Sequence, residues 1–376
     1  MANVCTVLIA LALLLAVAQS ALLGTDNNFR VLNGGVKISK LGIGTWAWGD
    51  QRYWRYSSDQ DLALQETFNY CLQRGGVNFF DTAEVYGGGK SELLLGRFRR
   101  SFSDVKPMIG TKFAPKPWVR GSDAVMTACR NSMDRLGVDS LGLYQIHWPA
   151  PGANEGYWDG VAKCYQKGWI RSVGVSNYGP AQLRAVHKFL GERGVPLGSN
   201  QVQYSLLSRG AEYSDLIKTA DELGVVTLAY SPLGQGILTG KYTMRDVPPG
   251  PRGALVAAAV PRARQLNKAI QGVAEAKTGS LGFPVSMAQV AINWCIAKGT
   301  VPIVGARTKE QAQDNCAALK WSLTQEEVIM LDAISKDSAL NLPNPLMGMG
   351  MSLPGFVKNL PIPRVRRETA ALPTSV

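Results

Sequence analysis

The segment IRSVGVSNYGPAQLRAVHKFLGERGVPLGSNQVQYS, residues 170–205, holds two strand-like runs on either side of a helix-like stretch. The runs IRSVGVSN and SNQVQYS are short and contain valine, isoleucine or tyrosine. Between them, PAQLRAVHKFLGERG has a helical period and closes on a glycine, as helix C-termini prefer. A strand, a covering helix and a second strand in this order predict two parallel strands joined by a helical crossover.

The same alternation begins at about residue 40 and continues along most of the chain. It gives eight strand-like runs, the other six being KLGIGTW, VNFFDTA, PMIGTKF, LGLYQIHW, VVTLAYS and VPIVGAR. SDAVMTACRNSMDRLG and SMAQVAINWCIAKG are further helix-like segments. Eight such units predict an α/β fold, a closed (β/α)8 TIM barrel. A doubly wound sheet is the alternative, but LGIGTWAWG lacks the third glycine that its dinucleotide-binding turn requires.

Polar side chains follow several of these strand-like runs. In a barrel, all strands end at the same mouth, so residues that are distant in sequence meet around one cavity. The sequence therefore predicts a site that is built from the polar residues at the strand ends: Asp81, Lys112, His147, Asn177, Gln201 and Tyr230.

The stretch DTAEVYGGGKSE, residues 81–92, allows two interpretations. A phosphate-binding loop would need glycine at Glu84, where a carboxylate would instead repel a phosphate. We therefore expect residues 87–89 to form a plain turn and Ser91 to cap the helix ELLLGRFRR. The informative half is Asp81 followed by Tyr86.

An aspartate, a tyrosine, a lysine and a histidine in one apolar mouth suit the reduction of a carbonyl group. A tyrosine, with a pKa of roughly 10, is a weak acid at neutral pH, and a nearby ammonium lowers that pKa. Asp81 would keep Lys112 charged, Tyr86 would donate the proton, and a neutral His147 would orient the carbonyl oxygen. None of these groups supplies a hydride, so a nicotinamide must.

Composition and charge restrict the protein class further. The chain has 376 residues, 46% of them hydrophobic, and a formal charge of +12. Its basic residues are scattered apart from PRVRRE near the end, so a phosphorylated cofactor or a solubilising surface explains the charge better than nucleic acid does. Six cysteines occur without a Cys-x-x-Cys pair, which argues against a disulfide framework, and no metal-ligand pattern is present.

The chain divides into three parts by its pattern. Residues 1–21 contain TVLIALALLLAVAQSA, an apolar leader shorter than a membrane span, so we expect no stable span in the mature form. Residues 22–335 form the predicted barrel, and residues 336–376 form a tail rich in proline and methionine. A secretory-type leader on a body of free thiols favours an organelle such as a plastid, with secretion as the alternative.

The motifs taken together resemble the aldo-keto reductase superfamily over roughly residues 30–335. They are GIGTW, DTAEVYG, GTKF, RLGVDSLGLYQIHWP, SVGVSN, NQVQYSLL, AYSPLGQGILTGKY and VGARTKEQAQDN, in family order. AYSPLGQGILTGKY is similar to the branch that holds channel β-subunits, aflatoxin aldehyde reductases and plastid or cyanobacterial oxidoreductases. The resemblance implies a TIM barrel, NADP(H), and Asp81, Tyr86, Lys112 and His147 as catalytic residues.

The resemblance also implies a cofactor site. Ser176, Asn177 and Gln201 would hold the nicotinamide carboxamide, and Tyr230 would stack on its ring. Arg307 would bind the 2′-phosphate, because a guanidinium matches phosphate oxygens. The other residues implied at the cofactor are Gly44, Thr45, Trp46, Asp81, Ser231, Leu233, Gly236, Gly305, Gln311 and Asn315.

Some features depart from the family pattern or leave the function open. Gly142 stands where the family usually has aspartate, so we expect a local change in the fourth barrel strand or its neighbours. The segment 245–265 is an unusual loop that would shape the substrate mouth or cover the cofactor. The expected activity is NADPH-dependent reduction of an aldehyde or ketone, with a small-molecule carbonyl as partner; the alternative is a cofactor-sensing regulatory subunit. Trp46, Trp48, Trp118 and Trp148 suit a flat or apolar aldehyde, while the physiological substrate and the oligomeric state stay open.

Overall fold

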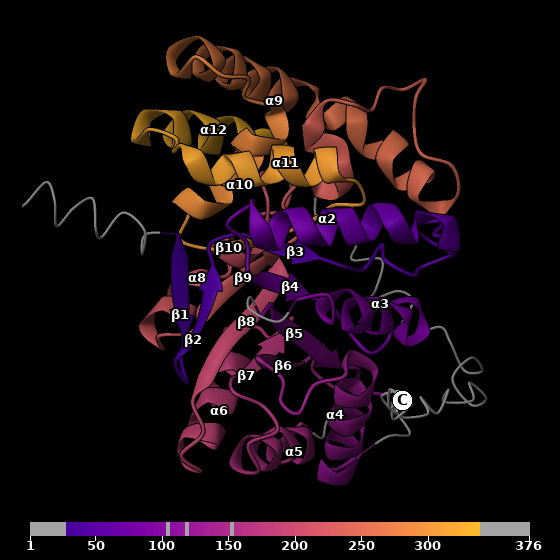
Figure 1. Ribbon diagram of the computed structural model, residues 1–376. Helices are drawn as coiled ribbons and strands as arrows, with labels where there is room; N and C mark the ends of the chain where they lie inside the picture. Colours follow the sequence, from indigo (N-terminus) through magenta and orange to yellow (C-terminus); the bar gives the residue numbers. More distant parts are fainter. Residues whose placement is uncertain (1–27, 103–105, 117–119, 151–153, 339–376) are drawn as a thin grey trace, which may run out of the picture. The chain divides into compact units, whose positions relative to one another are not determined.

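The structure of the protein is a computed structural model that describes residues 28–102, 106–116, 120–150 and 154–338 (Figure 1). The predicted leader, nearly all of the predicted tail and Trp118 lie outside the described residues, as does PRVRRE. Within these ranges, eight parallel strands form a closed barrel with the order β10-β3-β4-β5-β6-β7-β8-β9. Each predicted strand-like run overlaps one of them, which confirms the TIM barrel. They are β3 (Gly42–Gly44), β4 (Phe79–Asp81), β5 (Met108–Phe113), β6 (Leu143–Ile146), β7 (Val173–Ser176), β8 (Leu197–Gln203), β9 (Val226–Tyr230) and β10 (Val301–Gly305).

The helices cover the outside of the barrel, and Figure 1 shows α9 to α12 gathered on one side and α4 to α6 on another. The three helices predicted by period are present as α4, α6 and α10, each beginning within one residue of its predicted start. The described helices are α2 (Asp61–Gln73), α3 (Lys90–Arg99), α4 (Ser122–Leu136), α5 (Glu155–Gln166), α6 (Pro180–Gly191), α7 (Gly210–Tyr213), α8 (Leu216–Glu222), α9 (Pro251–Leu281), α10 (Met287–Ala297), α11 (Lys309–Ala317) and α12 (Gln325–Ser338). Short 3-10 turns are η1 (Ser58–Gln60), η2 (Tyr86–Gly89), η3 (Gly234–Thr239) and η4 (Ala318–Lys320).

The sequence pattern did not predict a β-hairpin that precedes the barrel. Strands β1 (Phe29–Leu32) and β2 (Val36–Ser39) pair antiparallel. The buried side chains of Leu32, Val36 and Ile38 pack with the inward-facing apolar residues of the barrel strands: Phe79, Met108, Leu143, Leu228, Val301 and Ile303. These barrel residues all come from the first three residues of their strands, so the hairpin fills the end of the barrel opposite the site.

The segment 245–265 is mostly helix rather than the loop expected from the family pattern. Helix α9 begins at Pro251, and proline is favoured in the first turn of a helix because its fixed φ suits it. The residues ALVAAA that follow are mostly alanine and leucine, the strongest helix formers. The helix continues through Pro261, so one internal proline does not end it.

The structure also tests the expectations for Ser91 and for the strand next to Gly142. Ser91 does not cap α3, because the cap position is Gly89 in a left-handed conformation and Ser91 lies inside the helix. Its hydroxyl instead donates to the carbonyl oxygen of Thr45 at 3.0 Å and so ties α3 to the end of β3. Next to Gly142, β6 pairs regularly with both neighbours, and the register shift in the barrel lies one strand further, between β7 and β8.

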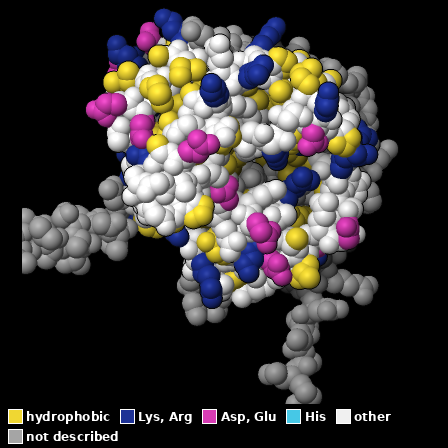
Figure 2. Space-filling view, turned by 90° about the horizontal axis from the view of Figure 1, so that it is seen from above, with side chains coloured by type: hydrophobic (Ala, Val, Ile, Leu, Met, Phe, Trp, Pro, Cys, Tyr) yellow, Lys and Arg dark blue, Asp and Glu magenta, His cyan; other side chains and the backbone are white. Residues whose placement is uncertain are grey.

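The distribution of basic side chains on the surface and the free state of the cysteines agree with the sequence analysis. Figure 2 shows lysine and arginine side chains spread among acidic ones over this face rather than gathered in one patch. The five cysteines of the described chain, all within helices, are buried free thiols. No described helix has the length and apolar character needed to cross a membrane.

Candidate active site

The ends of β4 and β5 bring the predicted aspartate, lysine and tyrosine together. Lys112 is fully buried, and its Nζ lies 2.5 Å from Asp81 Oδ2 and 3.4 Å from the Tyr86 hydroxyl. It also donates to the carbonyl oxygen of Thr82 at 2.8 Å. The ammonium group is therefore fixed from three directions, with the phenol of Tyr86 as one of its neighbours.

The position of Tyr86 depends on the glycines that follow it. The three residues after Tyr86 have positive φ values of 56°, 65° and 92°, which side chains strongly disfavour. At Gly87 a Cβ atom would also approach the Gly49 oxygen to 2.5 Å. The expected plain turn is thus a sharp left-handed one, and it turns the chain from the Tyr86 loop directly into α3.

Two amide side chains hold Asp81 on its other side. Gln201 Nε2 donates to Asp81 Oδ1 at 2.7 Å, and Gln145 Nε2 lies 3.4 Å from the same atom. Gln201, predicted at the nicotinamide, therefore also orients the aspartate. Sequence reasoning missed Gln145, although it lies two residues before His147, and alternate residues of a strand share a face.

Burial dominates the electrostatics of the lysine and the tyrosine. It lowers the pKa of Lys112, and the adjacent Asp81 opposes that change. Burial, and then the charges of Asp81 and Tyr230, raise the pKa of Tyr86 well above its usual value. This direction is opposite to the one expected from Lys112 alone, because the burial of the phenol outweighs the effect of the ammonium. Tyr86 is consequently protonated throughout the neutral range.

His147 follows the end of β6 and faces Tyr86, with their ring centroids 5.7 Å apart. Burial, and then the charge of Lys112, lower the pKa of His147 well below its usual value, so the imidazole is neutral at neutral pH. Its Nδ1 atom is buried without a hydrogen-bond partner among the described residues. A buried polar atom without a partner is costly, which marks this nitrogen as one that an external polar group can satisfy.

Ser176, Asn177 and Tyr230 form a hydrogen-bonded row beside the histidine. Asn177 has a left-handed backbone with φ of 62°, and its Nδ2 donates to the His147 carbonyl oxygen at 3.0 Å. The same nitrogen lies 3.0 Å from Ser176 Oγ, while the Tyr230 hydroxyl donates to Asn177 Oδ1, also at 3.0 Å. The predicted nicotinamide residues thus adjoin the predicted catalytic residues.

Aromatic rings border this polar centre. The Trp46 ring lies 6.2 Å from the Tyr86 ring and stacks on Tyr53 at 5.0 Å. On the other side, the Trp148 ring lies 4.5 Å from the His147 ring. Trp48, which was also expected at the mouth, is instead fully buried in the core and donates to the Ala306 carbonyl oxygen.

The other predicted cofactor residues form two groups at the ends of β9 and β10. After β9 the backbone has positive φ at Ser231, Gln235 and Gly236, so the loop through Leu233 turns sharply. After β10, Arg307 N–H donates to Gln311 Oε1 at 2.8 Å and Asn315 Nδ2 to the Gly305 oxygen at 3.3 Å. At β3, Gly44 is the last strand residue, and both the backbone N–H and the hydroxyl of Thr45 donate to the Asp81 carbonyl oxygen.

Arg252, in the first turn of α9, is a site residue that sequence reasoning missed. Its guanidinium lies over the Trp54 ring, 4.5 Å from the centroid, and its Nε is buried without a partner among the described residues. Arg307 Nη1 donates to the Trp54 carbonyl oxygen at 3.2 Å. No pattern in the sequence identifies Arg252, because the helix that positions it was expected to be a loop.

The two arginines lie close enough for their charges to interact. Burial lowers the pKa of Arg307, and the positive charge of Arg252 lowers it further. Within the described ranges, neither guanidinium forms an ion pair with a carboxylate. Two adjacent cations without an acidic partner repel each other, and a phosphate between them would remove that repulsion. The residues present therefore fit a phosphorylated dinucleotide.

Comparison with known proteins supports one family. The profile of the Aldo/keto reductase family matches residues 40–336. A chloroplastic pyridoxal reductase of Arabidopsis thaliana is 44% identical over 82% of this chain and 86% of its own length. A methylglyoxal reductase of Escherichia coli, YeaE, is 30% identical over 80% and 92%. An aldo-keto reductase of Klebsiella pneumoniae, solved in complex with NADPH, superposes with a TM-score of 0.65 at 26% identity over 82% of this chain and 95% of that one.

Proposed function

This chain belongs to the aldo/keto reductase family, and from that premise we propose how its residues carry out NADPH-dependent reduction of a carbonyl group. The observation that carries the proposal is the contact of Lys112 with both Asp81 and the Tyr86 hydroxyl. The relatives compared above are named as reductases, which gives no support to a regulatory subunit.

We propose that Tyr86 is the proton donor. Its raised pKa keeps the phenol protonated, as a general acid must be before it reacts. Lys112 stabilises the phenolate that remains after transfer, and Asp81 holds Lys112 in place. The neutral imidazole of His147 would donate a hydrogen bond to the same carbonyl oxygen, which orients the substrate and spreads the charge that develops on that oxygen.

We propose that the cofactor is NADP(H) and that its phosphates lie at Arg307 and Arg252. When bound, the reduced nicotinamide supplies the hydride. Ser176, Asn177 and Gln201 would hold the carboxamide, and the ring of Tyr230 would lie against the nicotinamide. The remaining predicted residues would line the dinucleotide: Gly44, Thr45, Trp46, Ser231, Leu233, Gly236, Gly305, Gln311 and Asn315.

We propose that the substrate is a flat aromatic aldehyde of the pyridoxal type. The rings of Trp46 and Trp148 border the pair formed by Tyr86 and His147, so a planar substrate would contact aromatic surface while its oxygen meets the two polar groups. The similarity to a pyridoxal reductase supports this choice. Methylglyoxal, the substrate in the name of the more distant relative, would not use that aromatic surface.

We further propose that residues 1–21 direct the protein to a plastid and that residues 22–335 form the catalytic barrel. The chloroplastic relative supports the location. The buried free thiols suit a reducing compartment. Fusing residues 1–40 to a fluorescent protein and imaging it in plant cells tests the location; fluorescence in the secretory pathway would contradict it.

Replacing Tyr86 with phenylalanine tests the catalytic proposal. We expect the variant to lose turnover of pyridoxal by at least about a thousandfold, since it removes the proton donor while leaving the cofactor site in place. NADPH oxidation at 340 nm gives the rate, and quenching of tryptophan fluorescence gives the affinity for NADPH. Turnover close to that of the wild type would contradict the role of Tyr86.

A further inference from the structure

Glu84 connects the loop that carries Tyr86 to the strand that carries Lys112. Its backbone N–H lies 3.3 Å from the Lys112 carbonyl oxygen, and its side-chain Oε1 accepts the backbone N–H of Ala114 at 2.7 Å. Glu84 is two residues before Tyr86, and Ala114 is two residues after Lys112. The two hydrogen bonds therefore join the two chain segments on either side of the contact between phenol and ammonium.

We propose that Glu84 is a positioning residue for the proton donor, because its carboxylate holds the Tyr86 loop against the end of β5. This inference rests on the proposed function. The contact between Lys112 Nζ and the Tyr86 hydroxyl is long, at 3.4 Å, and the other partners of Lys112, Asp81 and Thr82, hold the ammonium but not the phenol. The distance between the ammonium and the phenol depends on the spacing between the backbone at Tyr86 and the backbone at the end of β5. The hydrogen bond from the Ala114 N–H to Glu84 helps to set that spacing. Small displacements of catalytic groups cost large factors in rate.

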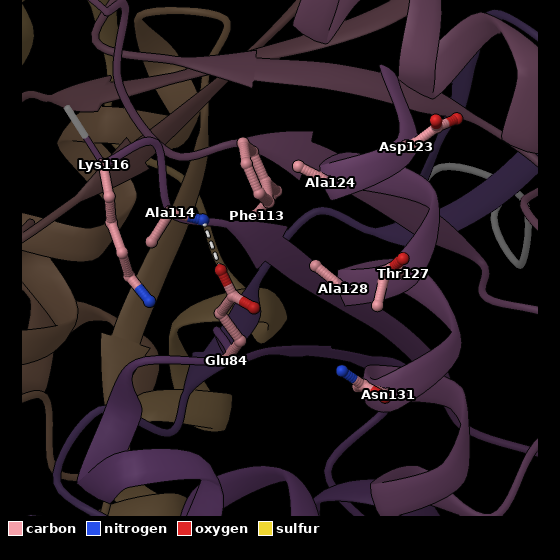
Figure 3. A pocket seen from close by; sticks show the side chains of 9 residues that line it. All are labelled: Glu84, Phe113, Ala114, Lys116, Asp123, Ala124, Thr127, Ala128 and Asn131. Atoms are coloured by element: carbon pink, nitrogen blue, oxygen red, sulfur yellow. Dashed lines mark hydrogen bonds between the residues drawn. The ribbon is translucent and has the colours of Figure 1, made fainter. Parts of the chain in front are cut away.

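The carboxyl group of Glu84 also faces a cavity of about 400 Å³ between this loop and α4. Figure 3 shows the Glu84 side chain pointing to the backbone of Ala114, with the lining side chains of α4 across the cavity. The cavity gives solvent protons access to the carboxyl group, and Glu84 itself is half-buried. Its lining residues are Glu84, Phe113, Ala114, Lys116, Asp123, Ala124, Thr127, Ala128 and Asn131.

Burial raises the pKa of Glu84 to about 7, and the charge of Glu92 on α3 adds to the effect. The Ala114 N–H, then Lys116 and Arg135, oppose the shift. Two further titratable groups adjoin Glu84: Asp123 on α4 lines the same cavity, and the buried phenol of Tyr144 on β6 interacts with the Glu84 charge.

The pKa of Glu84 is higher than the usual pKa of glutamate, so Glu84 changes its charge within the neutral range. The catalytic groups Tyr86 and His147 do not change their charge there. Tyr86 is protonated there, and His147 is neutral. An ionised carboxylate accepts the Ala114 N–H about twice as strongly as a neutral acid does. The Tyr86 loop is therefore held more firmly above pH 7 than below it, and we expect kcat to rise about fivefold through pH 7.

Two substitutions at Glu84 separate positioning from charge. Glu84→Gln keeps an oxygen that can accept the Ala114 N–H but cannot ionise. We expect it to retain kcat within about threefold of the wild-type value at pH 6 and to show no step near pH 7. Glu84→Ala removes the acceptor, and we expect kcat for pyridoxal to fall about tenfold or more while the affinity for NADPH stays unchanged.

Asp123→Asn is the matched control, because Asp123 is an exposed carboxylate on the same cavity and makes no bond to Ala114. It should reproduce the wild-type rate and pH profile. A step near pH 7 that persists in Glu84→Gln, or a wild-type kcat in Glu84→Ala, would overturn the proposal. So would equal losses of kcat and NADPH affinity in Glu84→Ala, which would indicate a general folding role. A wild-type protein that reduces no aldehyde would instead defeat the proposed function.

Discussion

The Tyr86 hydroxyl lies 3.4 Å from an ammonium, yet its pKa is raised, because burial of the phenol, and then the charge of Asp81, outweigh the effect of the ammonium. Neighbouring charges therefore need to be considered together rather than pairwise. The sequence predicted which residue types meet at the site, since Asp81, Lys112 and His147 lie at or next to strand ends and Tyr86 lies on the loop after Asp81. It could not predict the sign of the shift, because burial and the two amides on Asp81 follow only from the folded barrel.

The pair formed by Arg307 and Arg252 also has to be considered as two interacting charges. We expect Arg307→Ala to raise KM for NADPH about 10- to 100-fold, the factor for losing a charge-assisted hydrogen bond to phosphate, and to change KM for NADH little. Steady-state kinetics with each cofactor measures this difference. Equal changes for both cofactors would place Arg307 at the pyrophosphate instead of the 2′-phosphate.

Arg245 provides the control for charge alone. It is an exposed arginine shortly before α9, so Arg245→Ala removes the same positive charge from the protein without removing a buried guanidinium. Its KM for NADPH should match that of the wild type. A comparable rise would mean that the overall positive charge, rather than the built site, attracts the cofactor.

Among the elements, the strands were predictable and their close packing was not. Short apolar runs rich in valine, isoleucine, phenylalanine or tyrosine between helical segments identified all eight barrel strands. Gly142, however, fits its place because Met108 of the neighbouring strand fills the space where a side chain would lie. A Cβ atom at Gly142 would come within 2.4 Å of Met108 Sδ and 3.2 Å of the Ile109 oxygen. Such a pair is visible only when β5 and β6 lie side by side.

We expect Gly142→Asp to destabilise the protein by about 1–3 kcal/mol, because the new side chain overfills this space. Chemical denaturation measures the free energy of unfolding. In a Met108→Ala background the same substitution should cost less, since the thioether no longer competes for the space.

Gly272→Asp on α9 serves as the comparison, because a Cβ atom there meets no atom within 4 Å. It should change the unfolding free energy little. If Gly142→Asp proved as harmless as Gly272→Asp, the crowding between Gly142 and Met108 would be unimportant.

In the whole molecule, the two ends of the barrel have separate tasks. The polar strand ends form the candidate site, and the hairpin of β1 and β2 fills the opposite end with Leu32, Val36 and Ile38. The hairpin escaped prediction because its two strands are only four residues each, and the barrel residues that they pack against lie far along the chain. The barrel, by contrast, follows from a repeat that the sequence shows directly.

Ile38→Ala should therefore lower stability without affecting catalysis. We expect a loss of about 2–5 kcal/mol in the free energy of unfolding, the usual range for emptying a buried aliphatic position. KM and kcat at 25 °C should stay at wild-type values, because the substitution is at the end of the barrel away from Tyr86.

Val31 lies on the same hairpin but is 61% exposed, so Val31→Ala should change stability by no more than about 0.5 kcal/mol. A marked change in KM for Ile38→Ala, or equal losses of stability in both variants, would contradict this division of tasks between the two ends.

The guanidinium of Arg252 lies over the rings of Trp54 and Tyr242 and donates to the Gln235 carbonyl oxygen at 2.6 Å. A long flexible side chain has thereby lost its rotamer entropy during folding rather than at the moment of binding. Immobilising such a side chain when a ligand binds costs about 0.5–1.5 kcal/mol, and here that cost is absent from the binding equilibrium. An anion would therefore meet a rigid receptor, and its dissociation would not be accelerated by disorder in the arginine that holds it.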